Sequence, residues 1–188
     1  MGIHALLSAV VMAVLLAGCV MAPVHYYEPV DTPYKTLGGP CGAGPEDRVL
    51  LEYGDVTFQV SIERESESPA LLIGIDIPEG HVVRLLADTL LVNGESRSLG
   101  PARTWDAEQA AVVAVGDELV GSGEKKVRWI VSDTSVLPKH FTIETSLPPA
   151  QDQYRIQLPA MLLDGEHRAL PELLFRKASG VFSTPINC

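Results

Sequence analysis

The sequence predicts an all-β domain, an antiparallel β-sandwich of the immunoglobulin-like type. Apolar and polar residues alternate with a period of two over many short segments, which buries one face of a strand and exposes the other. Turn-forming residues separate these segments at intervals of about 8 to 12 residues, the spacing typical of sandwiches and barrels. Two of the separators, Asn93-Gly94 and Asp164-Gly165, are dipeptides that favour tight hairpin turns.

The strands of the first half follow from this alternation. Val56, Phe58, Val60 and Ile62 alternate with polar residues, and a second alternating run ends where Pro78-Glu79-Gly80 interrupts it. Asn93-Gly94 then joins two short strands into a hairpin. The candidate strands here are 56–62, 71–77, 82–86, 90–92 and 96–99.

The second half continues the same pattern. Pro148-Pro149 and Pro159 end two of its strands, because proline cannot donate a ladder hydrogen bond. Asp164-Gly165 marks the second hairpin. The candidate strands are 127–131, 141–145, 154–158, 161–163 and 173–177, with a short apolar pair at 181–182.

Residues 106–115 fit two kinds of element. Gln109 follows Asp106 by three residues, a spacing typical of a helix-capping box, whereas the Ala-Val run that follows also suits a strand. We expect a short helix or an irregular excursion between strands.

The N-terminus is uncharged and apolar and ends in Leu16-Ala17-Gly18-Cys19. This motif resembles the lipobox of bacterial lipoproteins, in which Leu16, Ala17 and Gly18 are read by the signal peptidase. The resemblance implies removal of residues 1–18 as a signal peptide and acylation of the Cys19 thiol. Two or more acyl chains would hold the protein on a membrane. The alternative is a retained membrane helix, since the uncharged run continues to Ala22.

Lipoprotein sorting depends on the residue after the cysteine, which is Val20 here rather than aspartate. The resemblance therefore implies the outer membrane of a bacterial cell envelope. Removing 18 of the 188 residues leaves 170, enough for one domain. Prolines and glycines are dense up to Pro45, so we expect residues 19–45 to be a flexible tether and residues 46–188 to be the domain.

Two cysteines remain once Cys19 is assigned to lipid. Cys41 precedes the domain and Cys188 ends the chain, and in an oxidising compartment such a pair predicts one disulfide that joins the two ends of the domain. Closing so long a loop stabilises a fold by on the order of 4 to 5 kcal/mol. A redox couple or a metal site is the alternative, but the chain has no Cys-x-x-Cys.

The net charge of −10 argues against nucleic acid and anionic lipid head groups as partners, because both would be repelled. The chain also lacks the common hydrolase motifs, such as Gly-x-Ser-x-Gly and His-Glu-x-x-His. His25, His81, His140 and His167 are scattered, which favours surface or turn positions over metal ligation. We therefore expect neither an enzyme, nor a cofactor, nor a metal site.

These observations favour a membrane-anchored envelope lipoprotein whose sandwich is a structural or interaction module, with another envelope protein as a possible partner. Two alternatives stay open. One is a periplasm-facing carrier of a small apolar ligand, or a hydrolase without a recognisable motif, and it predicts a pocket with converging polar groups. The other is a metal-handling lipoprotein, which requires histidines to converge in the fold.

Overall fold

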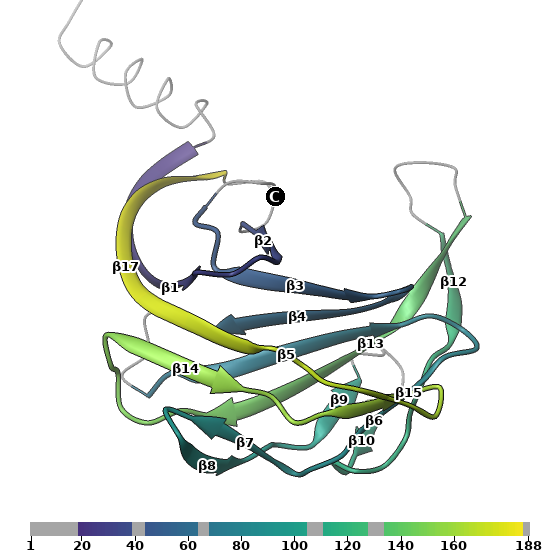
Figure 1. Ribbon diagram of the computed structural model, residues 1–188. Coiled ribbons are helices and arrows are strands. Elements are labelled where there is room, and N and C mark those ends of the chain that lie inside the picture. The colour runs from purple at the N-terminus through teal and green to yellow at the C-terminus, as the bar shows by residue number, and fades with distance from the viewer. Residues whose placement is uncertain (1–18, 39–43, 64–67, 105–110, 128–133, 186–188) are drawn as a thin grey trace, which may run out of the picture.

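The computed structural model describes residues 19–38, 44–63, 68–104, 111–127 and 134–185. Every helix or strand assigned in these ranges is a β-strand, and the strands pair antiparallel (Figure 1), so the predicted all-β antiparallel sandwich is confirmed. The strands are β1 (Cys19–Val30), β2 (Lys35–Leu37), β3 (Arg48–Tyr53), β4 (Val56–Ile62), β5 (Ala70–Ile77), β6 (Val82–Leu85), β7 (Thr89–Val92), β8 (Glu95–Ser98), β9 (Ala102–Thr104), β10 (Val112–Val113), β11 (Leu119–Val120), β12 (Gly123–Val127), β13 (Thr134–Ser146), β14 (Gln153–Gln157), β15 (Met161–Leu163), β16 (Glu166–Arg168) and β17 (Glu172–Pro185).

The strands form three sheets. The eight-stranded sheet has the order β10-β9-β13-β5-β4-β3-β2, with β12 paired to β13. The five-stranded sheet has the order β1-β17-β14-β7-β8 and faces it, and the four-stranded sheet β11-β6-β15-β16 closes one end (Figure 1).

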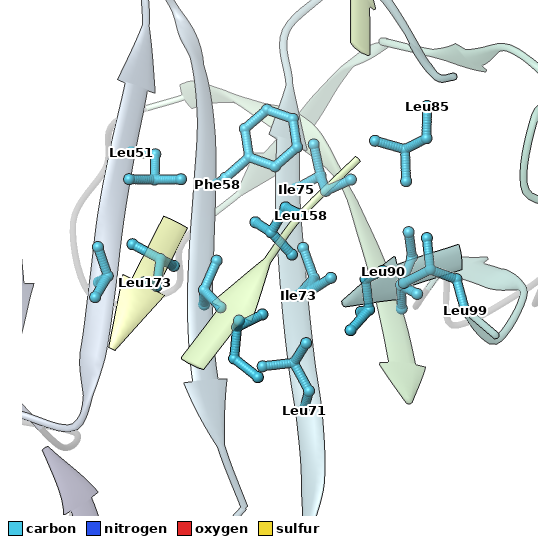
Figure 2. Packing of buried hydrophobic residues seen from close by; sticks show 14 of the residues in the cluster. Leu51, Phe58, Leu71, Ile73, Ile75, Leu85, Leu90, Leu99, Leu158 and Leu173 are labelled. Atoms are coloured by element: carbon cyan, nitrogen blue, oxygen red, sulfur yellow. The ribbon is translucent and has the colours of Figure 1, made fainter. Parts of the chain in front are cut away.

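The core lies between the two larger sheets. Phe58 and Ile75 come from the eight-stranded sheet, and Leu90 and Leu173 approach them from the opposite layer (Figure 2). On β4 the buried residues are every second one, which is the alternation that the sequence predicted. Burying each such large apolar side chain is worth about 1.5–3 kcal/mol, so the alternation determines which face of each strand packs inward.

Both predicted hairpin turns are confirmed. Asn93 and Gly94 have φ of 52° and 85°, and Asp164 and Gly165 have φ of 53° and 84°. A type I′ turn requires positive φ at both central residues, which Asn, Asp and Gly tolerate better than other residues. These turns join β7 to β8 and β15 to β16.

The segment expected to be a tether forms strands instead. β1 pairs with β17 along its whole length, from Cys19 opposite Pro185 to Val30 opposite Leu174, and β2 pairs with β3. Its prolines were interpreted as strand breakers. β1 is the outermost strand of its sheet, however, and an edge strand accommodates proline because only one of its edges pairs.

Two further expectations fall partly outside the described residues. Of the segment 106–115, residues 106–110 lie outside the described residues, and Val112–Val113 forms the short strand β10 paired with β9 where we expected a helix or irregular excursion. Most of the strand predicted at 127–131 lies outside the described residues. β13 begins at Thr134 and runs to Ser146, so it is much longer than the predicted strand at 141–145.

Candidate functional site

Polar residues cluster on the outward face of the eight-stranded sheet. Alternate side chains of β4 and β5 are buried in the core, and the positions between them are partly exposed. The register places the outward positions of β4, β5 and β13 side by side. We call six of them the Asp76–His140 cluster: Thr57 and Gln59 on β4, Gly74 and Asp76 on β5, and His140 and Thr142 on β13.

Asp76, His140 and Thr142 form a continuous chain of hydrogen bonds. His140 lies directly opposite Asp76, and its Nδ1 is 2.7 Å from Asp76 Oδ1. Its Nε2 is 3.2 Å from Thr142 Oγ1, two residues further along the same strand. The imidazole thus links a carboxylate to a hydroxyl. The side chains of His140 and Asp76 are 43% and 23% exposed, so solvent reaches this row of hydrogen bonds at the imidazole.

The second carboxylate oxygen of Asp76 is also held by hydrogen bonds. Thr57 Oγ1 lies 3.4 Å and Gln59 Nε2 3.3 Å from Asp76 Oδ2. The hydrogen bond with His140 is the main reason that the pKa of Asp76 lies below its ordinary value, and Thr57 and Gln59 add to this against the opposing effect of burial. Asp76 is therefore ionised at neutral pH.

The glycine at position 74 makes room for the imidazole. A Cβ on Gly74 would lie 3.0 Å from His140 Cε1 and 3.6 Å from its Nε2. The ring therefore lies against the backbone of β5 at a position where any larger residue would push it away. Gly74 is also directly opposite Thr142 in the register, and the imidazole that covers Gly74 is the one bonded to the Thr142 hydroxyl.

A cation lies beside the cluster on the next strand. Arg103 on β9 is directly opposite Thr142 and is exposed. Directly opposed residues have Cβ atoms about 4.5–5.5 Å apart, which is well within the length of an arginine side chain. The guanidinium of Arg103 is thus within reach of a molecule bound at Thr142.

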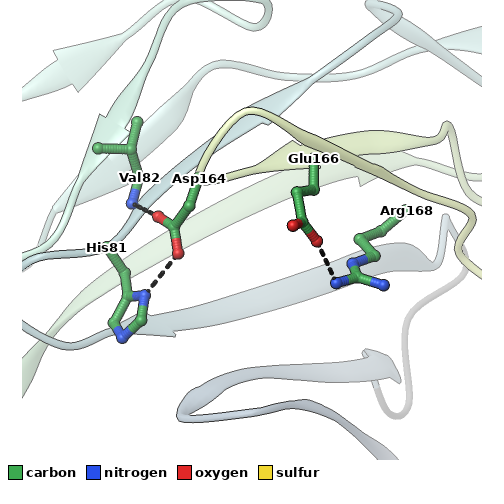
Figure 3. Close-up of polar contacts among 5 residues, drawn as sticks. All are labelled: His81, Val82, Asp164, Glu166 and Arg168. Carbon is green, nitrogen blue, oxygen red and sulfur yellow. Dashed lines mark hydrogen bonds and ion pairs between the residues drawn. The ribbon is translucent and has the colours of Figure 1, made fainter.

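A second histidine–carboxylate pair lies at the end of the four-stranded sheet. His81 Nδ1 is 2.8 Å from Asp164 Oδ2, and Asp164 Oδ1 accepts a hydrogen bond from the Val82 amide at 2.8 Å (Figure 3). The Asp164 amide also donates to the Val82 carbonyl at 2.9 Å. These contacts attach the β15–β16 turn to the start of β6. Among the described contacts, no hydroxyl is bonded to the other ring nitrogen of His81, Nε2. We therefore regard this pair as structural.

Most of the residues singled out by the sequence lie apart from the Asp76–His140 cluster. Cys19 is the first residue of β1, whereas Leu16, Ala17, Gly18, Cys41 and Cys188 lie outside the described residues, so the predicted lipidation and disulfide stay predictions. His25 and His167 are exposed on β1 and β16. Across the described ranges, no three His, Cys, Asp or Glu side chains are placed to hold a metal ion.

The sequence contained only part of the signal for this cluster. Alternation placed Asp76 and His140 on the polar faces of their strands, and His140 was interpreted as a surface residue, which its exposure bears out. The link between Asp76 and His140 depends on the register between β5 and β13, and these two residues are 64 positions apart. Nothing in the local pattern of either strand determines that register.

No family model, no curated protein and no solved structure matches the chain. Within the described part of the chain, no helix has the length and apolar character needed to cross a bilayer.

Proposed function

We propose that this chain is a lipid-anchored lipoprotein of a bacterial cell envelope, whose β-sandwich presents the outward face of its eight-stranded sheet to a partner. The observation that carries the proposal is Leu16-Ala17-Gly18-Cys19 at the end of an apolar, uncharged stretch. Val20 after the cysteine favours the outer membrane over retention at the inner membrane.

The pairing of β1 with β17 supports a defined geometry for such an anchor. An acyl group on Cys19 would be attached to the end of a two-stranded ribbon, since Cys19 pairs with Pro185. Tyr27 is the first buried residue among residues 23–30 of β1, and it is eight residues beyond Cys19, which is about 27 Å along a strand. The ribbon would therefore act as a spacer between the bilayer and the domain.

The anchor is tested by expressing the full chain in bacteria with an alkyne-labelled fatty acid, beside the variant Cys19→Ser. We expect the label in the wild type only, in the membrane fraction, and an intact mass that begins at Cys19 and carries the acyl groups. A full-length, unlabelled chain in the membrane would contradict the proposal in favour of a retained helix. An unlabelled chain in the soluble fraction would contradict both.

The partner surface is tested by photo-crosslinking in intact cells. A photoreactive residue at Glu52, which is exposed on the outward face of β3, is compared with one at Arg168 on β16. We expect a defined adduct from the sheet face that is absent from the control position. Equal crosslinking from both positions would contradict a specific surface.

A further inference from the structure

We propose that Thr142, His140 and Asp76 are the nucleophile, the general base and the orienting carboxylate of an acyl-transfer site that hydrolyses esters of small acyl groups. This goes beyond an interaction role and replaces the expectation that the chain is not an enzyme. It does not depend on the lipid anchor.

The three groups have the geometry that nucleophilic catalysis requires. A weak hydroxyl nucleophile needs a base within hydrogen-bond reach, about 2.6–3.2 Å, and the base must in turn be oriented by a third group. Thr142 Oγ1 lies 3.2 Å from His140 Nε2, and His140 Nδ1 lies 2.7 Å from Asp76 Oδ1. All three residues stand on adjacent strands of one sheet, a rigid support for such an arrangement.

The contacts also select the productive protonation state. An ionised Asp76 only accepts hydrogen bonds, so the Nδ1 of His140 must carry the proton that it shares with Asp76. In the neutral imidazole, Nε2 is then the acceptor and faces the Thr142 hydroxyl. Asp76 itself is kept in place by Thr57 and Gln59.

Arg103 supplies a positive charge where the reaction develops a negative one. It lies opposite Thr142, so its guanidinium is within reach of the oxygen of a carbonyl attacked by Thr142 Oγ1. Thr142 is half-buried on the outward face of the sheet, next to the exposed Arg103, so a small acyl group would approach it from the solvent side. The alcohol part of the substrate would extend over the polar face formed by Gln59 and Thr57.

The reaction proceeds in two steps. First, Thr142 Oγ1 bonds to the ester carbonyl carbon and its proton passes to His140 Nε2; the bond to the alcohol oxygen then breaks, and the alcohol leaves with that proton. Second, the oxygen of a water bonds to the acyl carbon and gives its proton to His140 Nε2. The bond to Thr142 Oγ1 breaks, Thr142 regains the proton, and the carboxylic acid is released.

The test uses the full chain in detergent with p-nitrophenyl acetate as the probe. We compare the wild type with Thr142→Val, which keeps the branched shape without the hydroxyl, and with Thr142→Ser, which keeps the hydroxyl. We expect Thr142→Val to lower kcat/KM by at least about 10²-fold, to the buffer rate, and Thr142→Ser to retain activity. Asp76→Asn is expected to lower kcat nearly as far as Thr142→Val, because it favours the wrong imidazole tautomer, and Arg103→Met by up to about 10²-fold.

If the role of His140 were purely structural, replacing it with another ring would leave the esterase activity unchanged. Its ring covers Gly74, and His140→Phe preserves a ring there while removing both nitrogens. We expect His140→Phe to unfold at the same temperature as the wild type, within a few degrees, and to lose the activity. Rapid acidification during turnover should also trap one acetyl group, located at Thr142 by peptide mass spectrometry.

The proposal is overturned if the wild type hydrolyses the ester no faster than Thr142→Val, or if the trapped acetyl group lies elsewhere. Activity that survives in His140→Phe would overturn it as well. Because Cys19→Ser removes only the anchor, loss of membrane attachment with unchanged ester hydrolysis separates a failure of the lipoprotein proposal from a failure of this one.

Discussion

Tyr27 on β1 packs against Tyr154 on β14, with ring centroids 5.2 Å apart, although β17 runs between their two strands. The Tyr27 hydroxyl donates a hydrogen bond to the carbonyl of Gln151 at 3.0 Å. Both side chains are buried. This contact joins the N-terminal strand, which the sequence suggested was a tether, to the core of the domain.

Replacing Tyr27 should loosen β1. We expect Tyr27→Ala to lower the free energy of unfolding by about 3 kcal/mol, because a buried ring and its contacts are lost, and Tyr27→Phe by about 1 kcal/mol, because only the hydrogen bond is lost. Urea unfolding measures both. Tyr34→Ala, at a 38% exposed position, is the matched control and should stay within about 0.5 kcal/mol of the wild type. Equal effects at Tyr27 and Tyr34 would show that β1 is not attached through Tyr27.

The Tyr154 hydroxyl stabilises the turn that precedes its own strand. It lies 2.9 and 3.1 Å from the carbonyls of Pro148 and Pro149 and accepts a hydrogen bond from the Gln151 amide. Burial, followed by the nearby Tyr27, raises the pKa of Tyr154 from 10.0 to about 12. The folded state therefore holds this proton more tightly than the unfolded chain does. The resulting stabilisation is fully present below pH 10 and is lost as the pH rises towards 12.

Tyr154→Phe is expected to lower the free energy of unfolding at pH 7 by about 1 kcal/mol, because the carbonyls of Pro148 and Pro149 lose their donor and the Gln151 amide loses its acceptor. It should also show a smaller loss of stability between pH 10 and pH 12 than the wild type does, since the group responsible for that part of the loss is gone. Urea unfolding at several pH values measures both effects. Parallel pH profiles for the two proteins would contradict the assignment to Tyr154.

Asp164 has two roles that different substitutions separate. Its φ of 53° disfavours residues other than Gly, Asn and Asp, so Asp164→Ala should cost about 1 kcal/mol more than Asp164→Asn. The hydrogen bond with His81 is the main reason that the pKa of Asp164 lies below 3.8, so its stabilisation is present above that pH and is lost as the pH falls through the folded-state pKa. Thermal unfolding at pH 7 and pH 3 should show a shallower acid dependence for Asp164→Asn. An unchanged acid dependence would argue against the His81 contact.

Gly121 tolerates no side chain. A Cβ there would lie 1.9 Å from the carbonyl oxygen of Pro78 and 2.8 Å from Ile77 Cγ2, and the backbone atom cannot move without displacing the β5–β6 turn. We expect Gly121→Ala to lower the free energy of unfolding by at least about 2 kcal/mol in a denaturant titration. The neighbouring Ser122→Ala should have little effect, and similar values for the two variants would contradict the close approach.

The predicted disulfide between Cys41 and Cys188 is tested by peptide mapping under non-reducing conditions. We expect one crosslinked peptide containing both residues in protein purified without reducing agent, and a loss of stability on reduction of at most about 5 kcal/mol. Two free thiols that react with an alkylating agent in the native protein would contradict the pairing.

The hairpins show where local sequence was sufficient. Asn93-Gly94 and Asp164-Gly165 adopt the predicted turns because Asn, Asp and Gly tolerate positive φ whatever segments surround them. The inward faces of β4 and β5 were equally predictable. A strand whose apolar and polar residues alternate has one apolar face, and this does not depend on which strand pairs with it.

The fate of residues 19–30 was not predictable in this way. Pro23 and Pro29 disfavour regular structure taken alone, but at the edge of a sheet they are compatible with a strand, and β17 is more than 140 residues away along the chain. The Asp76–His140 contact has the same origin, since it exists only because β5 and β13 pair in one register, with Gly74 leaving room for the ring.

The amino-acid sequence by itself determined the strand class, the tight turns and the lipobox-like motif, because each depends on residues close together in the chain. The tertiary structure alone decided that β1 completes a sheet and that a carboxylate, an imidazole and a hydroxyl form one hydrogen-bonded chain. Such pairings depend on contacts between distant segments, and it is the packing of the whole core that selects their register.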